Sequence, residues 1–117
     1  MFNIVVVKDP INLSELQKKA SEGFGDMIKA VVDVDQEIMA LGSELHVDAE
    51  AILIGREGSV RESTWGINLY PRKTGEEFLE FDSMVNIKPA FGNRSRSVDN
   101  VEVQNKVKNV VAKLIIK

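Results

Sequence analysis

Residues 27–41 read MIKAVVDVDQEIMAL, and this segment gives the clearest indication of the type of sheet. It contains two apolar, strand-prone runs, residues 27–34 and 37–41, which are separated by Asp35 and Gln36. Two such runs joined by two polar residues predict an antiparallel hairpin. Because the joining residues are not Asn-Gly, the sequence leaves the type of turn open. An antiparallel sheet is therefore the starting point for interpreting the rest of the chain.

Four further segments have the pattern of strands. Residues 2–7 are apolar on both faces, which is typical of a central strand. Residues 64–70 alternate, with Trp65, Ile67 and Leu69 on one face, and residues 78–88 alternate in the same way. Residues 45–54 are predicted to continue the sheet, with residues 55–59 as the next turn.

Two helices are predicted from capping signals. Asn12 followed by Glu15 forms a capping-box pattern, which starts a helix over residues 13–22 that Gly23 ends. Asp99 followed by Glu102 repeats the pattern and starts a second helix near Asp99. The second helix carries an apolar stripe at helical spacing. The stripe consists of Val103, Val107, Val110, Val111 and Leu114.

The order of these elements predicts an α+β fold. We expect one domain over residues 1–117, with a mainly antiparallel sheet of about five or six strands. The N-terminal and the C-terminal helix are expected to pack on one face of this sheet. Because at least two strands have polar faces, we expect the other face to be exposed to solvent.

Composition narrows the class of protein. The chain is 44% apolar and 28% charged, as in an ordinary folded domain. Its apolar runs are far shorter than the roughly 18 residues that a membrane span needs, and the N-terminus lacks the pattern of a signal peptide. Cysteine is absent, which suits a reducing compartment. We therefore expect a cytoplasmic protein that has no membrane partner.

Charge is distributed unevenly along the chain. The net charge of −3 excludes a generally basic nucleic-acid binder. Residues 1–60 nevertheless hold 5 basic and 11 acidic side chains, whereas residues 61–117 hold 10 and 7. Either the two halves attract each other within one domain, or the second half offers a basic face to an anionic partner.

Residues 44–50, ELHVDAE, are the first candidate for a site. In an extended backbone Glu44, His46, Asp48 and Glu50 would share one face, which would place the only histidine of the chain in a row of acids. The second candidate is the segment GNRSRS, residues 92–97, which carries two arginines just before the second helix. We expect the two segments to be neighbours that line one hollow.

Anion binding is the chemistry that these segments favour. Arginine suits phosphate and carboxylate, and the first amides of a helix are free donors. The predicted function is a non-catalytic binding module for an acidic or phosphate-bearing partner. The expected ligand-binding residues are Arg94, Arg96, Asn93, Asn68, Glu44, His46, Asp48 and Asp82. Alternatively, Arg94 or Arg96 pairs with Asp82, Glu44 or Asp48 and only fixes the loop.

Two other functions remain open. One histidine and no cysteine argue against structural zinc, so the main interpretation includes no metal or cofactor. Glu44, His46, Asp48 and Asp82 could instead hold Mg²⁺ or Mn²⁺ in a small metal-assisted hydrolase. A homo-oligomer that uses the polar sheet face as a subunit interface is the third possibility. The glycines form no phosphate-loop or dinucleotide-binding fingerprint.

Several short motifs, taken together, resemble a known family. They are FGDM at residues 24–27, KAVVDV at 29–34, GSELH at 42–46, WGINLYP at 65–71, EFDSMVNI at 80–87 and GNRSR at 92–96. This combination is similar to an uncharacterised family of small prokaryotic proteins that is catalogued as a domain of unknown function. The similarity extends over nearly the whole chain. It implies a stand-alone domain and brings no activity, cofactor or catalytic residue with it.

Overall fold

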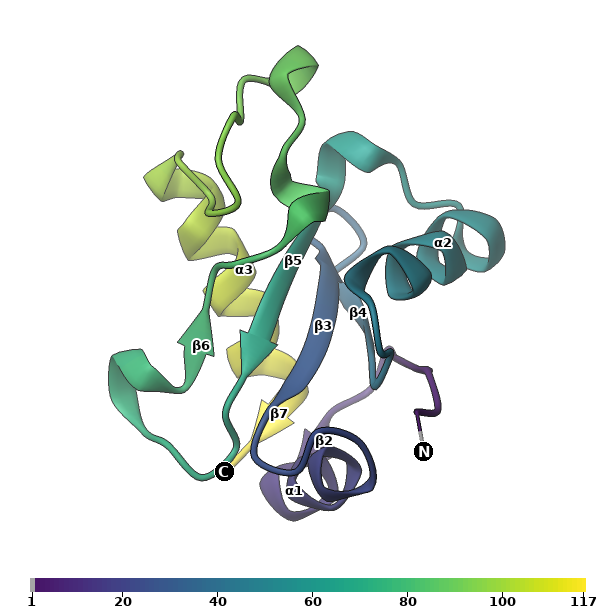
Figure 1. Cartoon of the computed structure of the whole chain (residues 1–117), viewed down its shortest axis with the longest axis vertical. Helices are drawn as coiled ribbons and strands as arrows, with labels where there is room; N and C mark the ends of the chain where they lie inside the picture. Colours follow the sequence, from purple (N-terminus) through teal and green to yellow (C-terminus); the bar gives the residue numbers. More distant parts are fainter. Residues whose placement is uncertain (1) are drawn as a thin grey trace.

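A computed structural model describes residues 2–117 as a central sheet between two layers of helices (Figure 1). Its five strands lie in the order β1-β4-β3-β5-β6, and every neighbouring pair is antiparallel. A second sheet of two parallel strands joins β2 to β7. The strands are β1 Val5–Val7, β2 Ile11–Asn12, β3 Ile28–Asp33, β4 Ile38–Leu41, β5 Thr64–Leu69, β6 Leu79–Glu80 and β7 Ile115–Ile116.

Within residues 2–117, three α-helices and four short 3-10 helices connect the strands. The α-helices are α1 Leu13–Glu22, α2 His46–Glu57 and α3 Val101–Leu114. The 3-10 helices are η1 Arg61–Ser63, η2 Gly75–Glu77, η3 Met84–Asn86 and η4 Pro89–Phe91. None of the helices within residues 2–117 is both long and apolar enough to cross a membrane.

The predicted hairpin is confirmed as β3 and β4, which pair in the register Val32↔Met39. Alternation along β3 sends Ile28, Ala30 and Val32 to the face that α1 and α3 cover, whereas Val31 faces α2. Trp65, Ile67 and Leu69 of β5 join the first of these two cores, as their shared face predicted. The sheet is therefore apolar on both faces, and helices bury both.

Helix α1 has the predicted bounds, and its N-cap is the predicted residue. The side chain of Asn12 accepts a hydrogen bond from the backbone N–H of Glu15 at 2.9 Å. Helix α3 begins one residue later than expected, because Asn100 rather than Asp99 caps it by accepting from Glu102 and Val103. Local hydrogen bonding alone thus places both of these helix starts.

The prediction of two helices on one face was incomplete. Residues 46–57 form helix α2, which packs on the opposite face through Ala49 and Leu53 against Val31, Ile38 and Ala40. The prediction that residues 45–54 continue the sheet was therefore wrong. Ala49 and Leu53 lie four residues apart on one side of the helix, so burial of that side outweighs the alternation seen in residues 44–50.

Two predicted strands also differ from the structure. Residues 2–7 contribute only the three-residue edge strand β1 rather than a central strand. Their two apolar faces reflect the helix layers on both sides of the sheet, because Val7 lies in one core and Val6 packs against the other. Of residues 78–88 only Leu79 and Glu80 form a strand. Beyond β6, Ser83 caps η3, and the chain passes over β5.

Candidate functional site

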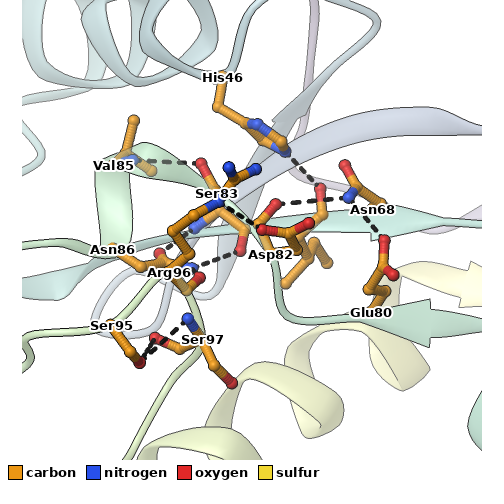
Figure 2. A network of polar contacts seen from close by, with 12 residues as sticks. His46, Asn68, Glu80, Asp82, Ser83, Val85, Asn86, Ser95, Arg96 and Ser97 are labelled. Atoms are coloured by element: carbon orange, nitrogen blue, oxygen red, sulfur yellow. Dashed lines mark hydrogen bonds and ion pairs between the residues drawn. The ribbon is translucent and has the colours of Figure 1, made fainter.

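A cleft lined largely by polar residues, here called the polar cleft, lies on the face of the sheet that α2 covers. It lies between α2, which packs against β3, and η3, which packs against β5. Its volume is about 660 Å³. Figure 2 shows the polar side chains that gather there from α2, β5, β6 and the loop before α3. The cleft is lined by Met27, Lys29, Leu45, His46, Val47, Asn68, Tyr70, Glu80, Asp82, Ser83, Met84, Val85 and Arg96.

His46 is the first residue of α2 and is 8% exposed. Its Nε2 lies 2.8 Å from the carbonyl oxygen of Ile67, and since a carbonyl only accepts, Nε2 carries the proton and donates. Burial lowers the pKa of His46 below 6.5, and nearby Lys29 lowers it further, while the contact with Ile67 opposes the shift. The ring is therefore neutral at pH 7, with Nδ1 as an acceptor.

Asn68 connects β5 to β6 at the floor of the cleft. Its Nδ2 donates to Oε1 of Glu80 at 2.9 Å and to the backbone oxygen of Asp82 at 3.4 Å (Figure 2). The hydroxyl of Tyr70 donates to the same Glu80 oxygen at 3.0 Å. The Oδ1 of Asn68 is buried and has no hydrogen-bond partner within residues 2–117. These bonds fix the Asn68 amide and leave one acceptor unused.

Arg96 and Asp82 form an ion pair at the mouth of the cleft. The Nε of Arg96 donates to Oδ1 of Asp82 at 2.7 Å, which orients the guanidinium. Within residues 2–117, the two Nη nitrogens of Arg96 have no hydrogen-bond or ion-pair partner. The prediction that an arginine of this loop folds back onto Asp82 is thus correct, and the pairing still leaves donors for a ligand.

The backbone around Arg96 is held by residues that follow β6. The carbonyl oxygen of Arg96 accepts from the backbone N–H of Ser83 at 3.0 Å and from Nδ2 of Asn86 at 2.9 Å. Asn86 also accepts from the N–H of Gly66 at 2.8 Å and donates to its carbonyl oxygen at 2.9 Å. The Asn86 amide thereby takes the place of a neighbouring strand on β5 and ties the loop to the sheet.

The other two predicted ligand-binding residues of this loop, Asn93 and Arg94, do not line the polar cleft. Asn93 is buried and donates to the carbonyl oxygens of Asn86 and Ser97 at 2.8 and 2.7 Å, while its Oδ1 accepts from the N–H of Asp99 at 2.9 Å. Its amide therefore holds the loop together. Arg94 is exposed and does not line the polar cleft.

The predicted row of acids does not exist as a row. Because residues 46–57 are helical, His46 and Glu50 lie one turn apart and are buried, whereas Glu44 and Asp48 are exposed and do not line the cleft. The alternative metal set of Glu44, His46, Asp48 and Asp82 is therefore not assembled. Across residues 2–117, no three histidine or acidic side chains are grouped as metal ligands.

The predicted set of ligand-binding residues missed four polar residues of the cleft, Lys29, Tyr70, Glu80 and Ser83. The available signal was the polar face of each strand. Asn68 and Tyr70 alternate on β5, and the register Asn68↔Glu80 places the polar face of β6 beside them. Lys29 is the one cation of residues 27–34, which are otherwise apolar except for Asp33, but only the pairing of β3 with β5 places it beside Asn68. The exposed apolar residues at the rim gave no signal; they are Leu45, Val47 and Met84, which are 53%, 53% and 66% exposed.

Comparison with known protein families identifies the family of this chain. A family model described as "Protein of unknown function (DUF5674)" matches residues 5–114 of the 117-residue chain. The chain belongs to this family. The match includes every residue that lines the polar cleft. No curated protein and no solved structure matches the sequence. Family membership thus confirms the resemblance and assigns no specific function.

Proposed function

We propose that this family member is a non-catalytic cytoplasmic binding module whose polar cleft receives an acidic or phosphate-bearing ligand. The observation that supports the proposal most is the guanidinium of Arg96, whose Nε is held by Asp82 while both Nη nitrogens lack a partner within residues 2–117. An arginine oriented in this way offers a two-pronged donor to phosphate or carboxylate. The absence of cysteine is what supports the cytoplasmic location.

The hydrogen-bond donors that remain unused in the cleft favour an anionic group beside Arg96. Lys29 lines the cleft, and its Nζ faces the ring of Phe24 at 5.2 Å from the ring centroid. The acids are engaged more fully, because Glu80 accepts from Asn68 and Tyr70 and Asp82 accepts from Arg96. An incoming anion therefore meets donors that have spare capacity.

The rim of the cleft favours an apolar part on the same ligand. Leu45, Val47 and Met84 stand exposed around the polar floor. Binding sites typically combine apolar walls with a few polar groups that fix orientation. The ligand class that fits is thus an anion that carries an apolar group, and phenyl phosphate is a suitable probe.

Thermal unfolding with a concentration series of phenyl phosphate tests the proposal. We expect the melting temperature to rise with the probe, since a ligand that binds only the folded state stabilises it. R96Q should abolish the shift. R94Q is the matched control, because Arg94 is exposed on the same loop outside the cleft, and it should keep the full shift. Sodium chloride at equal ionic strength corrects for general screening.

A second variant separates the two parts of the ligand. M84Q replaces an exposed apolar side chain with a polar one of similar size. It should therefore weaken the response to phenyl phosphate and leave the response to inorganic phosphate unchanged. If neither probe shifts the melting temperature, or if R94Q and R96Q behave alike, anion binding at this cleft is wrong.

A further inference from the structure

A second hollow lies on the opposite face of the sheet, where the sheet ends. This edge groove has a volume of about 870 Å³, and its lining residues come mainly from α3 and from β6 with its flanking residues. Figure 1 shows where these two elements lie. None of its lining residues belongs to the polar cleft. The groove is lined by Gly75, Glu76, Phe78, Leu79, Phe81, Gln104, Lys108, Val111, Ala112, Ile115, Ile116 and Lys117.

One wall of the edge groove is the last strand of the sheet. β6 pairs with β5 in the register Asn68↔Glu80 and Leu69↔Leu79, and it has no strand on its other side within residues 2–117. The N–H of Tyr70 donates to the carbonyl oxygen of Phe78 at 2.9 Å. Because hydrogen-bonded and non-hydrogen-bonded pairs alternate in an antiparallel ladder, Leu79 directs its N–H and C=O away from β5. The free edge of β6 therefore offers backbone groups to a further strand.

The floor of the groove is one stripe of α3. Gln104, Lys108, Val111 and Ala112 follow helical spacing and point to the same side, and Ile115 of β7 continues the floor beyond the end of α3. Val111 and Ile115 are buried, whereas Ala112 is a small, exposed residue that leaves space beneath the edge of the sheet. Ile116 is 56% exposed beside them. A strand added to β6 would lie above this stripe and send every second side chain onto it.

The mouth of the groove carries positive charge. Lys108 is exposed on α3, and Nζ of Lys117 lies 4.2 Å from the ring centroid of Phe78. Glu76 is the acid among the lining residues and stands in η2. An acidic side chain on the occupant would thus be stabilised near Lys108.

We propose that the edge groove binds an extended peptide segment of a partner protein, which pairs with β6 as a sixth strand of the sheet. Apolar side chains at alternate positions of the segment fill the groove, and an acidic side chain meets Lys108. A peptide fits better than an apolar small molecule, because it alone satisfies the outward N–H and C=O of Leu79.

A designed peptide tests the proposal. The probe is a fluorescein-labelled nonapeptide in which isoleucine alternates with threonine and one threonine is replaced by aspartate, measured by fluorescence polarisation. Two further versions carry N-methyl groups on alternate amides, one version on the odd and the other on the even positions. Since only one set of amides faces β6, we expect one methylated version to lose binding at least tenfold and the other to bind like the parent.

Variants of the protein locate the binding. A112E fills the groove and repels the aspartate, so it should weaken binding at least tenfold, and K108E should weaken it as well. K106E is the matched control, because Lys106 is exposed on α3 and does not line the groove. All three positions are exposed, so the fold should persist, which circular dichroism verifies.

Three results would overturn the proposal. The first is that no version of the peptide binds saturably. The second is that both methylated versions bind like the parent, which would describe a groove that accepts apolar chains without strand pairing. The third is that A112E and K106E have the same affinity as the unchanged protein.

Discussion

The ammonium group of Lys88 lies over the ring of Trp65, 3.8 Å from the ring centroid. Lys88 is buried and also donates to the carbonyl oxygens of Arg61 and Thr64. Burial lowers the pKa of Lys88 to about 8, although the nearby carboxylate of Glu50 opposes the shift. The ammonium group of Lys88 is thus buried and is held by a ring face and two carbonyl oxygens, unlike the solvent-exposed lysines of the surface.

This contact predicts a pH dependence of stability. The folded state releases the Lys88 proton near pH 8, whereas the unfolded chain releases it near its ordinary value of 10.5. Between these values the unfolded state binds more protons, so the free energy of unfolding should rise with pH, by up to about 1.4 kcal/mol per pH unit. Urea unfolding at several pH values from 7.5 to about 10 measures the rise.

The variant K88M should flatten this rise, since it has no proton to release. K106M is the control, because Lys106 is exposed. Equal slopes for K88M and the unchanged protein would show that Lys88 titrates alike in both states.

His46 predicts a second pH effect, in the acid range. Burial lowers its folded pKa below 6.5, so the unfolded state binds more protons as the pH falls from 6.5 toward the folded value, and stability should fall over that window. The chain has one histidine, so its imidazole resonances in a proton NMR titration are unambiguous. We expect a midpoint below 6.5 that rises when phenyl phosphate is present. A midpoint at or above 6.5 without ligand would contradict the burial of the ring.

Gly66 predicts a packing effect at the point where the chain crosses β5. A Cβ at this position would lie 2.4 Å from Oγ of Ser83 and 2.8 Å from Cγ2 of Val85. G66A should therefore lower the free energy of unfolding by about 1–3 kcal/mol, as overpacking does. G55A is the matched control, since a Cβ there meets nothing within 4 Å, and it should stabilise helix α2 by about 0.5–1 kcal/mol. If urea unfolding ranks the two variants in the opposite order, the close approach is wrong.

The Asn86 amide predicts a hydrogen-bonding effect at the same strand. N86A would leave both backbone groups of buried Gly66 without their partner, at a cost of about 1–3 kcal/mol for each group. Hydrogen exchange of the Gly66 amide should become faster, because its N–H would no longer donate to Asn86. N109A, at an exposed position inside α3, should leave the exchange of Gly66 unchanged and should not lower the free energy of unfolding, since alanine has the higher helix propensity. Unaltered protection of Gly66 in N86A would refute the strand-like role of this side chain.

Local signals predicted the parts of the fold that depend on local interactions. The bounds of α1 follow from the Asn12 cap and from Gly23, and the hairpin β3-β4 follows from two apolar runs around a short polar turn. The face of Trp65, Ile67 and Leu69 was predictable because alternation along a strand depends only on the backbone. In each case the residues that decide the outcome lie within a few positions of one another.

Helix α2 was not predictable in the same way. Two residues of its buried side, His46 and Glu50, are polar, so the apolar stripe that marks an amphipathic helix is interrupted. Their burial is tolerated because each has a distant partner: His46 donates to the Ile67 carbonyl, and Glu50 accepts from Thr64 at 2.8 Å. These partners become visible only when β5 lies beneath the helix.

The candidate site was likewise predictable only in the parts that depend on local sequence. The arginine-bearing loop and the pairing of an arginine with Asp82 were predicted, but the sequence did not distinguish Arg96, which lines the polar cleft, from Arg94, which does not. Lys29 and Glu80 could not be assigned to the cleft without the register of three strands.

The bounds of α1, the position of the central hairpin turn and the apolar face of β5 were predictable from the sequence, because these features depend on hydrogen bonds and side-chain directions within short segments. Three features required the packed structure: α2 covers the second face of the sheet, Arg96 rather than Arg94 reaches the polar cleft, and β6 has no further strand beside it within residues 2–117. These three features depend on contacts between residues far apart in the chain. The free energy of such contacts is gained only when the segments pack together.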